Sequence, residues 1–123
     1  MSIVDNTIRN NWFDGLSIGG ASNVFVANWD RNTGIVSNAG GGISISQGAD
    51  SASARPVESV VIDSANITGN HNFGIWFHTI AQPLNRIAIT NSCIQGNDMG
   101  ALSISGLGPE PVFKNNATSG CGN

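Results

Sequence analysis

The stretch TIRNNWFDGLSI at positions 7–18 returns without a gap as GIVSNAGGGISI at positions 34–45 and as NITGNHNFGIWF at positions 66–77. A fourth copy begins at Cys93 and needs a one-residue deletion near Met99 and Gly100. Every copy holds an aliphatic residue, an asparagine three positions later, a short polar turn and an aliphatic-x-aliphatic segment. Matched copies indicate a repeat architecture, in which each copy forms one unit that packs on the next.

A second aliphatic triplet precedes each copy, at positions 1–3, 24–26, 60–62 and 87–89. Alternate residues of a strand face opposite sides, so the outer members of each triplet are expected in a shared core and the middle member outside. The triplet ends five positions before the repeat isoleucine in three copies and nine positions before it in the second copy. This difference predicts a four-residue insertion at about 29–32.

These patterns predict an all-β protein, a parallel β-solenoid of about four coils. At 123 residues the chain is expected to form a single domain over 1–123, with loop excursions at 47–59 and 79–85.

Four asparagines share one position of the repeat and are spaced 27, 32 and 27 residues apart: Asn11, Asn38, Asn70 and Asn97. Because coils stack about 4.8 Å apart, each asparagine is expected to lie over its counterpart in the next coil. Their amides should bond to one another as a structural Asn ladder at a buried bend. The tight turn that follows is expected to need the conformational freedom of Gly15, Gly42 and Gly74.

Coils of at least 27 residues with an asparagine corner, and no hexapeptide repeat, resemble the right-handed parallel β-helix. This is the pectate-lyase-like superfamily, which also includes phage tailspikes, and the resemblance covers Ile3 to Lys114. It implies a right-handed coil and a protein that binds or acts on polysaccharide. The superfamily carries lyases, hydrolases, epimerases and binding proteins, so the function has to be argued from the site.

The outward positions of the segment after the glycine turn place Trp76 and His78 side by side, with hydroxyls in the coils above and below. A tryptophan ring stacks on the face of a pyranose, and hydroxyls bond to its edges. The predicted glycan-binding residues are Trp76, His78, Ser44, Ser46, Ser103 and Ser105. The alternative is that the 47–59 excursion simply covers Trp76.

The sequence leaves catalysis open. Glycoside hydrolysis usually needs two positioned carboxylates, and a lyase needs a base with a charge-neutralising group. The eight carboxylates do not converge in the repeat, so no catalytic residue is assigned. An enzyme on this chain would be a polysaccharide lyase or glycoside hydrolase with His78 as its base. A purely structural β-helix module is the remaining interpretation.

The composition of the chain limits the classes of partner that we expect it to bind. Charged residues make up 11% of the chain and the net charge is −3, which argues against a nucleic-acid partner because few cations are available to neutralise phosphates. No apolar stretch is long enough to span a membrane. We predict no metal and no cofactor. Cys93 and Cys121 are expected either to form a disulfide that ties down the C-terminal segment or to remain two free thiols.

The outward positions of the preceding strand carry a mostly apolar column, with Phe25, Val61 and Ala88 in successive coils. Such a column is typical of a packing surface, which predicts a homo-oligomer. The resemblance to tailspikes implies that this oligomer is a side-by-side trimer. A loop folded over it is the alternative. The first strand is preceded by no helix or polar cap, whereas Pro109-Glu110-Pro111 and the Gly-rich residues after it are able to blunt the other end. We therefore expect a segment of a larger β-helix or a subunit whose ends are covered by partners. A polysaccharide ligand would place the protein outside the cell or on a virion surface.

Overall fold

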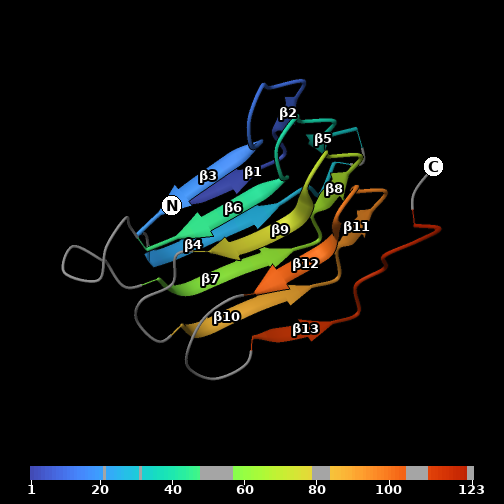
Figure 1. The fold of residues 1–123 in the computed structure, drawn as a ribbon. Helices are drawn as coiled ribbons and strands as arrows, with labels where there is room; N and C mark the ends of the chain where they lie inside the picture. The colour runs from blue at the N-terminus through green and yellow to red at the C-terminus, as the bar shows by residue number, and fades with distance from the viewer. Residues whose placement is uncertain (21, 31, 48–56, 79–83, 105–110, 122–123) are drawn as a thin grey trace.

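The computed structural model describes residues 1–20, 22–30, 32–47, 57–78, 84–104 and 111–121, which form strands and turns and no helix (Figure 1). The first coil contains β1 (Ser2–Val4), β2 (Thr7–Arg9) and β3 (Leu16–Gly19). The second contains β4 (Ser22–Ala27), β5 (Gly34–Val36) and β6 (Ile43–Ser46). The third contains β7 (Glu58–Asp63), β8 (Asn66–Thr68) and β9 (Phe73–His78). The fourth contains β10 (Asn85–Thr90), β11 (Cys93–Gln95) and β12 (Gly100–Ile104), and β13 (Val112–Lys114) begins a fifth. Within these ranges nothing helical is long and apolar enough to cross a membrane.

The strands stack in three parallel sheets, in the orders β1-β4-β7-β10-β13, β2-β5-β8-β11 and β3-β6-β9-β12. Figure 1 shows the strands of each sheet one below the other. This arrangement confirms the predicted all-β parallel solenoid. Four stacked strands of one sheet are separated by three steps, so, counted as complete turns, the solenoid makes about three, slightly fewer than predicted.

Aliphatic side chains of successive coils lie over one another in the core. The aligned columns are Ile3-Val26-Ile62-Ile89, Ile8-Ile35-Ile67-Ile94 and Leu16-Ile43-Ile75-Leu102. Members in the inner coils are buried, whereas Ile3, Ile8 and Leu16 in the first coil are only partly buried. The period-2 pattern therefore predicted which residues face inward, and stacking decides how deeply each one is buried.

The Asn ladder is confirmed. Asn11 Nδ2 donates to Asn38 Oδ1 at 2.9 Å, Asn38 Nδ2 to Asn70 Oδ1 at 2.9 Å, and Asn70 Nδ2 to Asn97 Oδ1 at 2.8 Å. Each receiving Oδ1 also accepts the backbone N–H of the asparagine one coil earlier. Asn38 and Asn70 are fully buried, so the ladder satisfies polar groups that no water reaches.

The glycines beside the ladder are needed for a different reason from the one predicted. Gly15, Gly42 and Gly74 do not adopt positive φ, so conformational freedom is not what selects them. A Cβ at Gly42 would instead collide with Ile67 Cγ2 of the next coil. A Cβ at Gly15 would collide in the same way with Ile35, and a Cβ at Gly74 with Ile94. These glycines are therefore selected for the space between stacked coils.

A second polar corner joins the first sheet to the second. Asn28 Oδ1 accepts the Asn66 N–H at 3.0 Å, and Ser92 Oγ accepts the Ala65 N–H at 3.0 Å. One coil further, Asn116 Oδ1 accepts the Ser92 N–H at 2.9 Å. The chain turns at this corner through residues in the left-handed region, with φ of 52–58° at Asp5, Ser64, Asn91 and Asn115.

The predicted insertion is confirmed at this corner. Two residues separate the first-sheet and second-sheet strands in the other coils, and six, 28–33, separate β4 from β5. The extra residues fold back on the corner, where the Asp30 N–H donates to Asp5 Oδ1 at 2.8 Å and Thr33 Oγ1 donates to Asp30 O at 2.6 Å. The pairing of β5 with its neighbours is unaffected.

The two cysteines form a disulfide, so the first of the two predicted alternatives is correct. Ala117 pairs with Cys93 in an isolated parallel bridge, and the Cys121 N–H donates to Gln95 Oε1 at 3.1 Å. The Cys93–Cys121 bridge, with Cα atoms 5.7 Å apart, thereby fixes the start of the fifth coil onto the fourth.

Candidate functional site

The outward face of the third sheet holds the predicted glycan-binding residues. Trp76 of β9 lies between Ser44 of β6 and Ser103 of β12, and His78 lies beside Ser46. The predicted adjacency is therefore present for these five residues. The sixth, Ser105, lies outside the described residues, as do positions 48–56 and 79–83 of the two excursions.

Three rings lie along the outward side of β9, and we call Phe73, Trp76 and His78 the aromatic row. The Trp76 and His78 rings are stacked, with centroids 4.2 Å apart and planes 25° apart. Phe73 contacts Trp76 in a tilted arrangement with centroids 6.5 Å apart. All three side chains are half-buried, so each ring is supported by the sheet and keeps part of its surface open.

His78 is held by a hydroxyl in the coil before it. Its Nε2 lies 2.7 Å from Ser44 Oγ, and Ser44 is only 3% exposed. The imidazole therefore leans across to the position under Trp76 and stays stacked on the indole. Ser44 contributes to this face by orienting His78, while the half-buried Ser46 and Ser103 are the hydroxyls that remain nearer to solvent.

Phe73 was not predicted as part of the site. It follows the polar turn and begins β9, and Gly100 lies opposite it in β12. Because Gly100 has no side chain, the Phe73 ring occupies the space above it, about 3.7 Å from where a Cβ would be. The signal available in the sequence was an aromatic residue three positions before Trp76 on the same strand.

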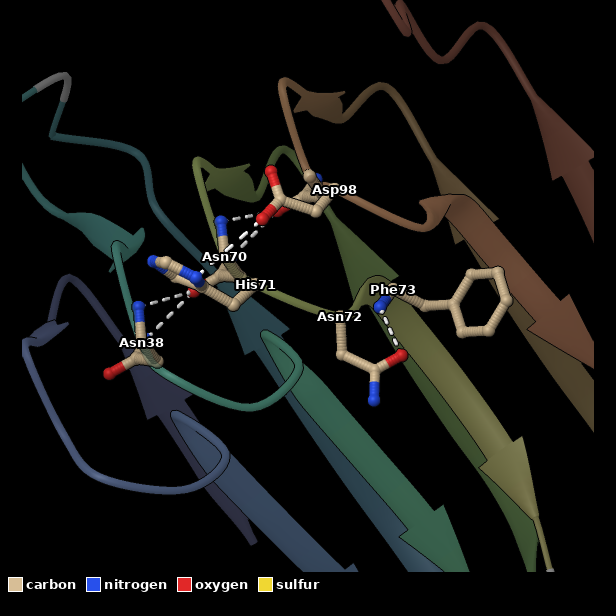
Figure 2. Close-up of polar contacts among 7 residues, drawn as sticks. Asn38, Asn70, His71, Asn72, Phe73 and Asp98 are labelled. Atoms are coloured by element: carbon tan, nitrogen blue, oxygen red, sulfur yellow. Dashed lines mark hydrogen bonds and ion pairs between the residues drawn. The ribbon is translucent and has the colours of Figure 1, made fainter.

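The Asn corner carries a second group of exposed rings and amides. The residue after each ladder asparagine forms a column of its own: Trp12, Ala39, His71 and Asp98. Figure 2 shows His71 and Asp98 projecting from the corner beside Asn38 and Asn70. His71 Nδ1 lies 3.5 Å from Asp98 Oδ2, and both side chains are about two-thirds exposed, so this ion pair is a surface contact.

A hollow of about 260 Å³ lies at the first coils of this corner. Its lining residues are Asn10, Asn11, Trp12, Ser37, Ala39 and His71. Trp12 is 89% exposed, more than any other large apolar residue among those described. Sequence reasoning did not select Trp12. The available signal was a tryptophan at a turn position that later coils fill with alanine, histidine and aspartate.

The apolar column of the first sheet lies in register. Phe25 pairs with Val61, Val61 with Ala88, and Ala88 with Val112, which extends the column by one residue. Trp29 from the insertion contacts Phe25, with ring centroids 5.9 Å apart. The insertion therefore covers part of one end of the column. The role of this column as an interface stays a prediction.

Asp63 is a structural carboxylate on the outward side of β7. It accepts hydrogen bonds from Thr90 Oγ1 at 2.7 Å, Asn91 Nδ2 at 2.9 Å and Ser64 Oγ at 3.2 Å. The hydrogen bond from Thr90, followed by that from Asn91, lowers the pKa of Asp63 below its ordinary value. A carboxylate that already receives three donors ties β7 to β10 and is unsuited to taking up a proton.

Within the described ranges, no cluster of three or more His, Cys, Asp or Glu side chains is arranged to hold a metal ion. No family model, curated protein or solved structure matches this chain. The geometry of the aromatic row and of the Asn corner is therefore the basis on which function has to be argued.

Proposed function

We propose that this protein binds polysaccharide along the aromatic row. The observation that carries the proposal is the continuous line of three supported, half-open rings formed by Phe73, Trp76 and His78. Sugar rings present apolar C–H faces that stack on aromatic rings and hydroxyl edges that bond to polar side chains. Ser46 and Ser103, in the coils on either side, supply hydroxyls next to the rings.

The row favours an extended glycan over a single sugar. The rings follow one another along a strand, with centroids 6.5 Å apart between Phe73 and Trp76 and 4.2 Å apart between Trp76 and His78. A sugar chain that lies along the strand is therefore able to contact more than one of these rings. With a net charge of −3, this protein has few cations to offer an acidic polymer, so we propose a neutral or weakly acidic polysaccharide.

We also propose that the protein is related to the pectate-lyase-like superfamily and that it has a tailspike-like role. The Cys93–Cys121 disulfide supports a location outside the cell or on a virion, because disulfides persist in oxidising surroundings. The Phe25, Val61 and Ala88 column supports a homotrimer that buries this face. Light scattering on a sizing column tests it: a trimeric mass that Val61→Glu converts to monomer is expected, and a monomeric wild type would exclude the interface.

Affinity electrophoresis tests binding directly. Gels containing dextran, xylan, galactan, polygalacturonate or alginate should retard the wild type in at least one case. Trp76→Ala should weaken the retention about tenfold, equivalent to about 1.4 kcal/mol, because it removes the central ring. Trp29→Ala is the matched control, since Trp29 lies on another face. Equal retention of the two variants would refute the row as the binding surface.

A second candidate is a polysaccharide lyase or hydrolase with His78 as general base. The 2.7 Å contact between Ser44 Oγ and His78 Nε2 favours it, because a base has to be held by an orienting partner. Binding ranks first because the imidazole face is stacked against Trp76 and Ser44 is buried. Turnover of the same polysaccharides that is lost in His78→Ala would establish the enzyme. No turnover, or turnover that survives the substitution, would reject it.

A further inference from the structure

We infer that the hollow at the Asn corner binds one uncharged pyranose ring, held between Trp12 and His71. The inference rests on the proposed function for the class of ligand, and on the corner residues alone for its place. Neither residue contributes to the aromatic row, which lies on the outward face of the third sheet.

The spacing of the coils creates a slot. The Ala39 N–H donates to Asn11 O at 2.9 Å and the His71 N–H donates to Asn38 O at 3.0 Å, so the three coils are in register at this position. Two coil steps separate Trp12 from His71, which is about 9.6 Å at the usual strand spacing. Ala39 lies between them, and its side chain occupies only the volume of a methyl group. Two ring-bearing side chains therefore flank a gap about as wide as one more ring with a contact on each face.

The floor of the slot offers polar groups that are not already used. Asn11 is the first member of the ladder, and its Oδ1 accepts nothing from the described residues, whereas the Oδ1 of each later member accepts two donors. The side chains of Asn10 and Ser37 also make no hydrogen bond within the described part of the chain. A carbonyl oxygen, an amide and a hydroxyl thus remain for a ligand that carries several hydroxyl groups.

The size and the chemistry of the hollow select the ligand. At about 260 Å³ it is smaller than the roughly 300–1,000 Å³ of pockets for drug-sized molecules, so it suits a single ring. Amides and a hydroxyl line it next to one histidine, and the Asp98 carboxylate lies 3.5 Å from that histidine. A carboxylated sugar or a nucleotide would meet no pair of cations here, whereas a neutral hexose would meet stacking surfaces and hydrogen-bonding groups together.

The three tryptophans make the inference directly measurable. Trp12, Trp29 and Trp76 each give one indole Nε1–H peak in a ¹⁵N-correlated spectrum, and Trp→Phe substitution of each assigns them. Titration with the methyl α-pyranosides of glucose, galactose and mannose is expected to shift the Trp12 peak saturably with at least one sugar. Methyl glucuronide should shift it less. No Trp12 shift with any neutral sugar, or a larger shift with the glucuronide, would overturn the inference.

Filling the slot provides the second measurement. Ala39→Leu places a branched side chain between the two rings and should weaken binding about tenfold, with the Trp29 and Trp76 peaks unmoved as a check of the fold. Ala88→Leu is the matched control, because it makes the same substitution in the first sheet, outside the lining of the hollow. Equal effects of the two substitutions would overturn the slot. A Trp12 shift in a protein whose gel retention does not depend on Trp76 would support the slot and reject the aromatic row. Retention that depends on Trp76 without any Trp12 shift would reject only the slot.

Discussion

Replacing Asn70 with alanine should be among the most destabilising single changes in this protein. Asn70 is fully buried, and its amide makes four hydrogen bonds. Its Oδ1 accepts the backbone N–H and the side-chain Nδ2 of Asn38, and its Nδ2 donates to Asn97 Oδ1 and to Ile35 O. The substitution removes all four at once while leaving the surrounding coils in place.

The magnitude follows from which partners are left without a bond. Asn38 Nδ2 keeps Ile8 O, and Asn97 Oδ1 keeps the Asn70 N–H, so these two groups remain satisfied. The Asn38 N–H loses its acceptor inside the protein, which costs about 1–3 kcal/mol, and the other lost hydrogen bonds add about 1 kcal/mol each. We expect a loss of about 4–6 kcal/mol, a large share of the roughly 5–15 kcal/mol by which domains are stable.

Asn11→Ala is the matched comparison. Asn11 is exposed, and the Asn38 Oδ1 that it donates to also accepts the Asn11 backbone N–H, so no buried group loses its only partner. We expect a loss below about 1 kcal/mol. Urea unfolding followed by circular dichroism measures both variants. Equal losses would refute the reasoning that burial and orphaned partners, rather than membership of the ladder, set the cost.

Three further changes test other parts of the structure. Gly42→Ala should lower the free energy of unfolding by about 1–3 kcal/mol through overpacking, whereas Gly19→Ala, whose Cβ would meet open space, should change it little; a harmless Gly42→Ala would contradict the space argument. Replacing Cys93 and Cys121 with serine together should cost up to about 3.5 kcal/mol by releasing a crosslink between residues 28 apart, measured against the wild type with and without reductant. Asp63→Asn should destabilise the protein near neutral pH. The pKa of this carboxyl is lower in the folded protein than its ordinary value of 3.8. The stability that the carboxylate contributes is therefore fully present above pH 3.8, and it is lost as the pH falls through the folded-state pKa. The difference between wild type and variant should therefore shrink in unfolding titrations from pH 6 to pH 2, and a constant difference would contradict the prediction.

The features that the sequence predicted are those repeated in every coil. The isoleucine columns and the Asn ladder appear at a fixed offset in each copy, so the strand period and the coil spacing were enough to place them. The insertion was predicted for the same reason, because a change in spacing is visible against an otherwise constant one. Repetition supplied the long-range contacts that a single copy does not reveal.

The features that were missed are those whose members differ from coil to coil. The second polar corner uses Asn28, Ser92 and Asn116 in successive positions. The insertion separates Asn28 from the β5 strand that follows it. The pairing of the cysteines depended on Cys121 reaching the fifth coil, a contact outside the four copies. The glycine requirement was assigned to turn geometry because a sequence shows a missing side chain and not the isoleucine one coil away.

The candidate site was predicted in outline. Strand alternation placed Trp76 and His78 together, and the register confirms their neighbours. It did not reveal that His78 reaches diagonally to Ser44, because a rotamer is chosen by local packing. Sequence reasoning did not select Trp12, because the residue type at its repeat position differs from coil to coil. The hollow that Trp12 lines forms only when three coils are stacked.

The insertion between β4 and β5 shows that chain length and strand pairing are independent at that corner. Six residues span a connection that two residues span elsewhere, and Val26 still pairs with Ile62 while Ile35 still pairs with Ile67. Lengthening a closed loop costs only about 0.6 kcal/mol per doubling. The two-residue connections at Ser64-Ala65 and Asn91-Ser92 are therefore candidate graft positions, where a foreign peptide displayed on this scaffold would stand at defined steps along one edge of the molecule.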